Sequence, residues 1–355
     1  MGPFKSHRVL GQPFFKGRAA LRQPGFATIR AGATATGRFF PLPRTVESPS
    51  IGLTLPGSEI AVTFAALLLT LTLQIPPTAA NPDAKAGPFD FADGDRVVLI
   101  GGTLIEREQA SGYWELALTL RNKDKAVTFR NLGWSGDTVW GESRGSFDGP
   151  AKGYAKLIEL TKELKPTVIL LCYGQNESFA GEKGVKAFAA QYEKLLKDLA
   201  PTKARFVLLS PTPFQEVAPL RDAKGKNANL AKYVAAIKEL AAGRKADFVD
   251  VFQNLSGKPA IPTENGVHYS EAGYAGTRMI FQPNETIDTS GSEDLRKAIV
   301  AKNELFFHRW RPQNETYLFL FRKHEQGKNA KELDEFDPLV AAKETEIAKL
   351  RGPAR

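Results

Sequence analysis

The sequence predicts an α/β fold, a three-layer α/β/α sandwich around a five-stranded parallel sheet, followed by a C-terminal helical extension. Short runs that are apolar throughout alternate with longer stretches in which apolar residues recur every three or four positions. Strands that are apolar on both faces are typical of parallel sheets with helices on both sides. In such sheets, chemistry gathers in the loops after the carboxyl ends of the strands.

Five strands and three helices are expected in the central part of the chain. The strands are expected at residues 97–101, 126–133, 167–174, 205–210 and 246–252. The helices are expected at residues 152–164, 184–199 and 227–243, and the last of them carries Leu230, Val234, Ile237 and Leu240 on one face. Strands that alternate with helices in this way predict a parallel sheet.

The pattern changes after Phe281. A polar, turn-rich segment is followed by residues 293–323, which are expected to be helical and aromatic. Residues 343–350 are expected to form a charged surface helix. We therefore divide the chain into an export segment with an upstream extension (1–83), a central domain (84–282) and a C-terminal extension (283–355).

The N-terminal part has the features of an exported protein. No charge occurs between Glu59 and Asp83, and residues 60–75 are almost wholly apolar, which is shorter than the roughly 20 residues that span a bilayer. Small residues at 78–80 suit a signal-peptidase site. A signal peptide at about 60–80 predicts a secreted or periplasmic protein without a stable membrane span in its mature form. The alternatives are a buried helix or a membrane anchor.

The charge and the cysteine content exclude two classes of protein. Of the net charge of +9, six units lie in residues 1–60, and the rest of the chain shows no basic stripe, so no nucleic-acid partner is expected. The basic N-terminal segment resembles a transit peptide, or it reflects a start codon assigned too far upstream.

The single Cys172 rules out an intrachain disulfide, and its apolar neighbours predict a buried side chain rather than a nucleophile.

Four short motifs follow four of the predicted strands. They are residues 101–104 (GGTL), 131–138 (NLGWSGDT), 174–177 (GQNE) and 265–268 (NGVH). In this order they resemble the GDSL, glycine, GxND and DxxH blocks of the SGNH/GDSL hydrolases, a family of esterases, lipases, thioesterases and carbohydrate deacetylases. The resemblance implies a flavodoxin-like sheet and acyl-ester hydrolysis without a cofactor.

The residues themselves fit acyl transfer, which needs a hydroxyl nucleophile, a base and donors for the oxyanion. Thr103 supplies a hydroxyl at a strand end, and His268 is the only histidine of the central domain. The side-chain amide of Asn176 and the backbone N–H of Gly136 complete the expected oxyanion hole with the N–H of Thr103. A structural role for His268 and a turn-capping role for Asn176 are the alternatives.

The sequence departs from the family pattern at the reacting positions. Thr103 replaces the usual Ser, and its methyl group restricts the side chain and crowds the carbonyl. Gly102 and Glu177 stand where the pattern has Asp. Asn265 replaces the acid of the fourth block, a change that costs about 10⁴ in rate in the Ser-His-Asp template. Glu264 is adjacent and is a candidate substitute for that acid.

Other residues near the predicted cleft have two interpretations. Ser135 is a rival nucleophile. Trp134 and Phe214 are candidate substrate-binding residues that stack a sugar or an aryl group, or simply pack. The aromatic residues of 306–321 form a second binding surface or dock the extension on the central domain. The histidines of the extension lack neighbours at metal-ligand spacing, so no metal is expected.

These observations lead to two hypotheses about function. The first is an exported hydrolase that cleaves a small-molecule or carbohydrate ester with Thr103 and His268. The second, motivated by the altered Thr103, Gly102 and Asn265, is a catalytically weak or inactive scaffold of the same type that binds a carbohydrate or a partner. The sequence does not specify the oligomeric state.

Overall fold

The computed structural model describes residues 89–281 and 286–352, so the predicted export segment lies outside the described residues. Its centre is a five-stranded, fully parallel sheet with the strand order β2-β1-β3-β4-β5. The strands are β1 (Arg96–Gly101), β2 (Thr128–Asn131), β3 (Val168–Cys172), β4 (Arg205–Leu209) and β5 (Asp247–Val249). This is the flavodoxin-like order, and the expected fold class is confirmed.

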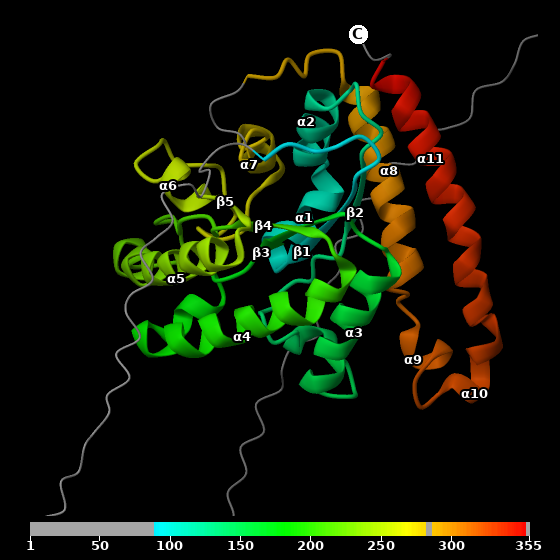
Figure 1. Cartoon of the computed structure of the whole chain (residues 1–355), viewed down its shortest axis with the longest axis horizontal. Helices are drawn as coiled ribbons and strands as arrows, with labels where there is room; N and C mark the ends of the chain where they lie inside the picture. The colour runs from blue at the N-terminus through cyan, green and yellow to red at the C-terminus, as the bar shows by residue number, and fades with distance from the viewer. Residues whose placement is uncertain (1–88, 282–285, 353–355) are drawn as a thin grey trace, which may run out of the picture. The chain divides into compact units, whose positions relative to one another are not determined.

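Helices cover both faces of the sheet (Figure 1). They are α1 (Thr103–Ser111), α2 (Tyr113–Arg121), α3 (Pro150–Glu163), α4 (Val185–Leu199), α5 (Ala223–Arg244), α6 (Val251–Leu255) and α7 (Glu271–Gly276). The three helices expected from the sequence correspond to α3, α4 and α5. The helices α1 and α2 were not expected, and none of the described helices is long and apolar enough to cross a membrane.

The two faces of the sheet have separate cores because successive residues of a strand point in opposite directions. On β1, Val98 and Ile100 pack with residues of α3, α4 and α5, including Tyr192. Val97 and Leu99 of the same strand pack with residues of α1, α2 and α7 on the other face. The strands are therefore buried on both sides, as their continuous apolar runs predict.

The C-terminal extension lies along the edge of the sheet next to β2. It contains α8 (Glu293–Trp310), α9 (Glu315–Leu318), α10 (Lys323–Gln326) and α11 (Phe336–Leu350), and α11 packs along α8 (Figure 1). Phe306 and Trp310 of α8 are buried in the same core as the sheet residues. These contacts favour docking of the aromatic segment over a free binding surface.

A buried ion pair ties α8 to the central domain. Lys302 Nζ donates to Glu115 Oε1 of α2 at 2.5 Å and to the carbonyl oxygen of Phe129 in β2 at 3.0 Å. Asn303 Nδ2 donates to the second oxygen of Glu115 at 3.1 Å. Because α8 satisfies a carbonyl of the edge strand, it closes that edge of the sheet against further pairing.

Candidate active site

Three of the predicted catalytic side chains meet at the carboxyl ends of β1 and β3. Thr103, Asn176 and His268 line one narrow cleft of about 20 Å³, together with Gly102 and residues of the loop after β3. This volume corresponds to about one water molecule. The structure thus brings together residues that lie as much as 165 positions apart in the sequence.

Thr103 is the first residue of α1 and follows β1 after a single glycine. The backbone N–H of Gly136 donates to Thr103 Oγ1 at 3.0 Å. Gly136 has a φ of +73°, in the left-handed region that favours glycine. At Gly102, a β-carbon would lie 3.3 Å from the carbonyl oxygen of Asp137 and 3.4 Å from the amide of Asn176. Glycine at this position therefore relieves a close approach between the loop after β1 and residues 134–138, which we call the oxyanion loop after their predicted role.

The side chain of Asn176 faces the oxyanion loop. Its Nδ2 donates one hydrogen bond to the carbonyl oxygen of Asp137 at 2.9 Å. An amide nitrogen has two hydrogens, so the second is left for an oxyanion. The side chain makes no capping bond to the 3₁₀ turn Glu177–Ala180 that follows it. The turn-capping alternative is thus not what the geometry shows.

On the other side of the cleft, Asn265 holds the His268 ring. Asn265 Oδ1 accepts hydrogen bonds from the backbone N–H groups of Val267 at 3.1 Å and His268 at 2.9 Å. Its Nδ2 lies 3.2 Å from Nδ1 of the imidazole. Since two backbone donors identify the oxygen end of the amide, the end that faces the ring is the donor.

This orientation determines the tautomer of the neutral imidazole. An amide N–H that donates to Nδ1 requires a lone pair there, and the ring hydrogen then lies on Nε2. A catalytic aspartate does the opposite, because it accepts from Nδ1–H and leaves the lone pair on Nε2 for the nucleophile. Asn265 therefore stabilises the tautomer of His268 in which Nε2 carries the hydrogen and is not a base.

The charged neighbours of His268 are Arg107 and Glu264. Partial burial of the ring, followed by the positive charge of Arg107, lowers the pKa of His268, while the charge of Glu264 opposes this shift. The carboxylate of Glu264 forms an ion pair with Arg107 at 2.8 Å. Asn265 contacts the ring, and Glu264 acts on His268 through its charge, so the role of Glu264 as a substitute acid remains a prediction.

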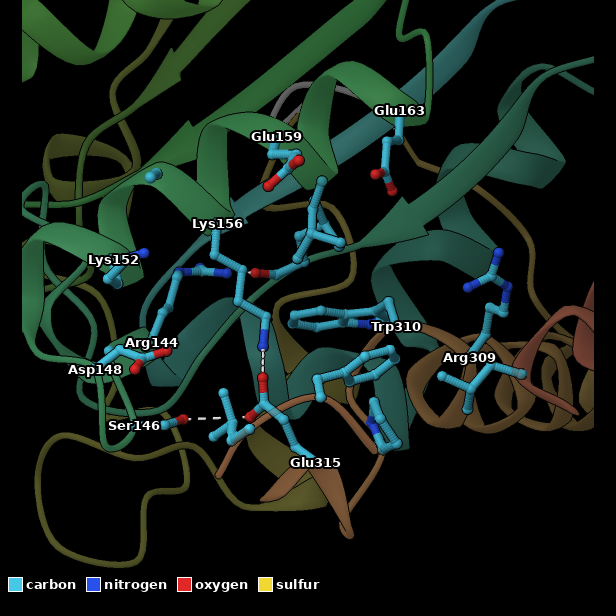
Figure 2. Close-up of a pocket in the computed structure, with 18 of the residues that line it drawn as sticks. Arg144, Ser146, Asp148, Lys152, Lys156, Glu159, Glu163, Arg309, Trp310 and Glu315 are labelled. Carbon is cyan, nitrogen blue, oxygen red and sulfur yellow. Dashed lines mark hydrogen bonds and ion pairs between the residues drawn. The ribbon is translucent and has the colours of Figure 1, made fainter. Parts of the chain in front are cut away.

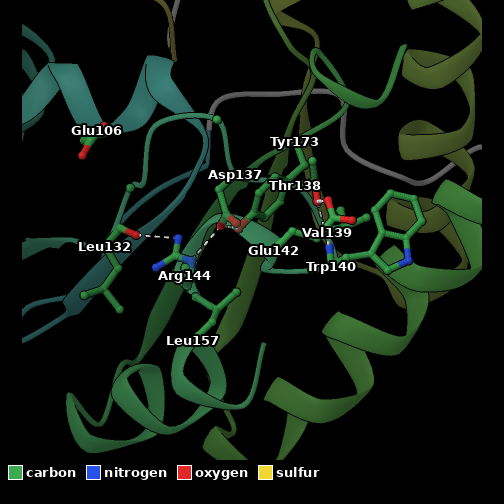
Figure 3. A network of polar contacts seen from close by, with 12 residues as sticks. Glu106, Leu132, Asp137, Thr138, Val139, Trp140, Glu142, Arg144, Leu157 and Tyr173 are labelled. Atoms are coloured by element: carbon green, nitrogen blue, oxygen red, sulfur yellow. Dashed lines mark hydrogen bonds and ion pairs between the residues drawn. The ribbon is translucent and has the colours of Figure 1, made fainter. Parts of the chain in front are cut away.

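A buried network holds the loop after Gly136 (Figure 3). Arg144 Nε donates to Asp137 Oδ2 at 2.7 Å, and its Nη2 donates to the carbonyl oxygen of Leu132 at 2.8 Å. Tyr173 donates its hydroxyl to the same carboxylate at 3.1 Å. Arg144 was not among the predicted site residues, because nothing in the local sequence connects it with the second motif.

Glu177 joins the third motif to the second. Its two carboxylate oxygens accept from the backbone N–H groups of Val139 and Gly174, both at 2.9 Å. Burial raises the pKa of Glu177 to about 7. The departure from Asp at this position thus supplies a longer side chain that reaches the neighbouring loop.

The predicted substrate-binding aromatics are both buried. Trp134 is 8% exposed and packs on Trp310, with ring centroids 5.9 Å apart. Phe214 is 3% exposed and packs on Phe179, which is 57% exposed. The structure shows their packing, and a contact with substrate stays a prediction. Cys172 is buried as expected, and burial raises the pKa of its thiol to about 12.

A larger cavity of about 820 Å³ lies between α3 and the C-terminal extension (Figure 2). Trp310 lines it, and Lys156 of α3 forms an ion pair with Glu315. None of its lining residues belongs to the predicted nucleophile, base or oxyanion donors, which line the narrow cleft instead. Within the part of the chain that the structure describes, no group of three or more His, Cys, Asp or Glu residues is arranged to hold a metal ion.

The chain has distant similarity to solved structures of several enzymes. One is a gut microbial diltiazem-metabolizing enzyme, with 12% identity and a TM-score of 0.49 over 76% of this chain and 98% of the other. Another is an α/β hydrolase enzyme from the metagenome of Lake Arreo, Spain, with 20% identity and a TM-score of 0.41 over 55% of this chain and 99% of the other. A third is an acetylxylan esterase from Geobacillus stearothermophilus, with 19% identity and a TM-score of 0.41 over 54% of this chain and 96% of the other. These similarities are too distant to indicate a substrate. No curated protein matches the chain.

The family comparison covers the region that contains every motif. The model of the GDSL-like lipase/acylhydrolase family matches residues 99–275, from β1 to α7. This range includes Thr103, Gly136, Asn176 and His268. Through this region the chain belongs to the GDSL-like lipase/acylhydrolase family and is a hydrolase of the class that acts on esters.

Proposed function

We propose that this protein hydrolyses esters of small acyl groups with Thr103 as nucleophile and His268 as base and then acid. The observation that carries the proposal is the 3.0 Å contact of the Gly136 N–H with Thr103 Oγ1, in a cleft that Asn176 and His268 also line. Thr103 Oγ1 is the attacking atom and not the oxyanion, so this contact places the Gly136 N–H beside the centre at which the oxyanion forms. The narrowness of the cleft, about 20 Å³, favours a short acyl group such as acetyl.

In the proposed reaction, Thr103 Oγ1 attacks the carbonyl carbon and its proton passes to Nε2 of His268. The carbonyl oxygen becomes an oxyanion that the N–H groups of Thr103 and Gly136 and the amide of Asn176 stabilise. The imidazolium then gives its proton to the leaving alcohol, and an acyl ester on Thr103 remains. Water, deprotonated by His268, hydrolyses this ester and regenerates the hydroxyl.

The resting tautomer limits the first step. Nε2 accepts the threonine proton only when the ring hydrogen lies on Nδ1, where Asn265 offers a donor instead of an acceptor. The reactive tautomer is thus disfavoured, and the resulting imidazolium lacks a carboxylate partner. We expect a slow enzyme, because its oxyanion donors are in place but His268 is a weakened base.

The same observation favours a second candidate function. A histidine held as a donor on Nε2 suits binding of an acceptor group, so an acyl-sugar or related ligand that binds without being cleaved is the alternative. Hydrolysis assays with purified protein distinguish the two. Release of nitrophenol from nitrophenyl acetate, decreasing with acyl length, is expected for the enzyme, whereas no hydrolysis of acetyl, feruloyl or longer acyl esters indicates the binding protein.

We also propose that the protein is exported and that its alcohol is a carbohydrate or another small molecule. The support is the uncharged apolar run at residues 60–75 and the small residues at 78–80, which suit cleavage after Ala80. N-terminal sequencing of the protein from its host should find Asn81 or a neighbour as the first residue. An exported protein that retains residues before Glu59 contradicts the proposal.

A further inference from the structure

The C-terminal extension reaches the loop that carries the oxyanion donor. Arg311, the residue after α8, forms an ion pair with Glu106 of α1 at 2.5 Å. Its guanidinium carbon lies 3.5 Å from the centroid of the Trp134 ring, which is a cation–π contact. The backbone N–H of Arg311 donates to the carbonyl oxygen of Phe307 at 2.9 Å, so the residue is anchored to the last turn of α8.

Glu106 connects this arginine to the oxyanion loop. One of its carboxylate oxygens accepts from Arg311, and the other accepts from the hydroxyl of Ser135. The side chains of Glu106 and Arg311 are only 14% and 26% exposed. At this degree of burial, water and salt screen the ion pair less than they screen a surface pair.

Arg311 therefore holds both residues that precede the oxyanion donor. It contacts Trp134 directly and Ser135 through Glu106, and the next residue is Gly136, whose N–H lies 3.0 Å from Thr103 Oγ1. On the other side of Gly136, the loop is held by the Asp137–Arg144 pair. A glycine between two arginine-fixed neighbours has little freedom to turn its N–H away.

We infer that Arg311 is a positioning residue of the active site: through Glu106 and Trp134 it fixes the direction of the Gly136 N–H. The inference rests on the proposed function, because the N–H matters for rate only when an oxyanion forms. Displacement of a reacting or stabilising group by about 1 Å costs about 100-fold in rate. The C-terminal extension is then a part of the catalytic machinery and not only a cover for the sheet edge.

The test compares Arg311→Gln with Arg309→Gln in the full chain. Arg309 lies on the last turn of the same helix but pairs with Asp334 and Asp337, both at 3.0 Å and both within the extension. For nitrophenyl acetate, we expect Arg311→Gln to lower kcat about 10- to 100-fold with less than about a 3-fold change in KM. Arg309→Gln should change kcat by less than about 2-fold. Equal losses in both variants overturn the inference, because they indicate a general effect of the extension.

Amide hydrogen exchange provides a readout that does not require turnover. In Arg311→Gln, the Gly136 amide should exchange at least about 10-fold faster than in the wild type, and in Arg309→Gln at the wild-type rate. Faster exchange without hydrolysis in any variant supports the loop contact and refutes the proposed function. Unchanged exchange at Gly136 overturns the inference, whatever the activity.

A double-mutant cycle separates this path from unrelated damage. If Arg311 acts through Glu106, the double variant Arg311→Gln/Glu106→Gln should lose no more kcat than the more damaging single variant. Losses that multiply indicate two independent effects and overturn the inference. Arg311→Lys, which keeps the charge for Glu106 but loses the planar contact with Trp134, should retain more kcat than Arg311→Gln.

Discussion

The two sides of the cleft differ in how well they match what the family motifs imply. On the oxyanion side, Gly136 donates to Thr103 Oγ1, and Asn176 points its amide nitrogen at the same loop. On the base side, Asn265 donates to the imidazole where an aspartate would accept. On the oxyanion side the loop is held by the buried Asp137–Arg144 pair, whereas His268 on the base side is only partly buried. Asn265 in place of an acid thus reverses the direction of the hydrogen bond to His268 in addition to removing a charge.

The largest effect is expected from Asn265→Asp. One carboxylate oxygen keeps the two backbone N–H groups, and the other accepts from Nδ1–H, so the lone pair moves to Nε2. We expect kcat/KM for nitrophenyl acetate to rise, with an upper limit of about 10⁴-fold. Asn265→Ala is the control and should not raise the rate. An unchanged rate in Asn265→Asp would show that the tautomer does not limit catalysis.

The nucleophile and the base are tested next. His268→Ala and Thr103→Ala should each lower kcat/KM about 10²- to 10⁴-fold, because each removes a group that takes part in proton transfer or attack. Thr103→Ser should keep or raise the rate by removing the crowding methyl group. Full activity in Thr103→Ala would exclude Thr103 and point to Ser135, whose hydroxyl bonds to Glu106.

The stability of the protein should depend on the buried ion pair between α8 and α2. Lys302→Met leaves the buried carboxylate of Glu115 without its cation, and we expect the free energy of unfolding to fall by about 3–5 kcal/mol. Lys297→Met is the control on the same helix, because Lys297 is 67% exposed and its ion pair with Asp294 lies at the surface. Denaturant unfolding measures both. Equal free energies of unfolding in the two variants would show that the buried ion pair of α8 contributes little to stability.

The smallest effect is a shift of the acid limb of the pH–rate profile. His268 acts as a base only when neutral, so the rate falls as the pH decreases through its pKa, which burial and Arg107 place below the usual 6.5. Arg107→Gln removes a charge that lowers the pKa, and the acid limb should move to higher pH. Glu264→Gln removes a charge that raises the pKa, and the limb should move to lower pH. Shifts in the same direction would contradict this assignment.

Local sequence patterns determined most of the central sheet and its largest helices. The strands β1, β3 and β4 differ from the expected ranges by at most two residues at either end. The edge strands are shorter than expected, because β2 pairs with β1 over only four residues and β5 pairs with β4 over only three. An apolar run predicts a buried strand, but the length of a strand depends on its partner.

The helices α1 and α2 were missed because their buried faces carry charges. Glu108 is buried in α1 and accepts from the backbone N–H groups of Trp114 and Glu115 at 2.8 and 3.1 Å. Glu115 is buried in α2 and pairs with Lys302, 187 residues later. A helical pattern based on apolar spacing does not include carboxylates that are buried with distant partners.

Residue types and their order along the chain were enough to predict Thr103, Asn176 and His268 as site residues, and the structure places all three on one cleft. Only the tertiary structure decided how they act. The tautomer of His268 follows from two backbone N–H groups that orient Asn265, and Arg311, the residue after α8, contacts Trp134 and Glu106 beside the loop that carries Gly136. Motifs specify residue types at positions along the chain, whereas hydrogen-bond direction and charge partners depend on distances that folding alone sets.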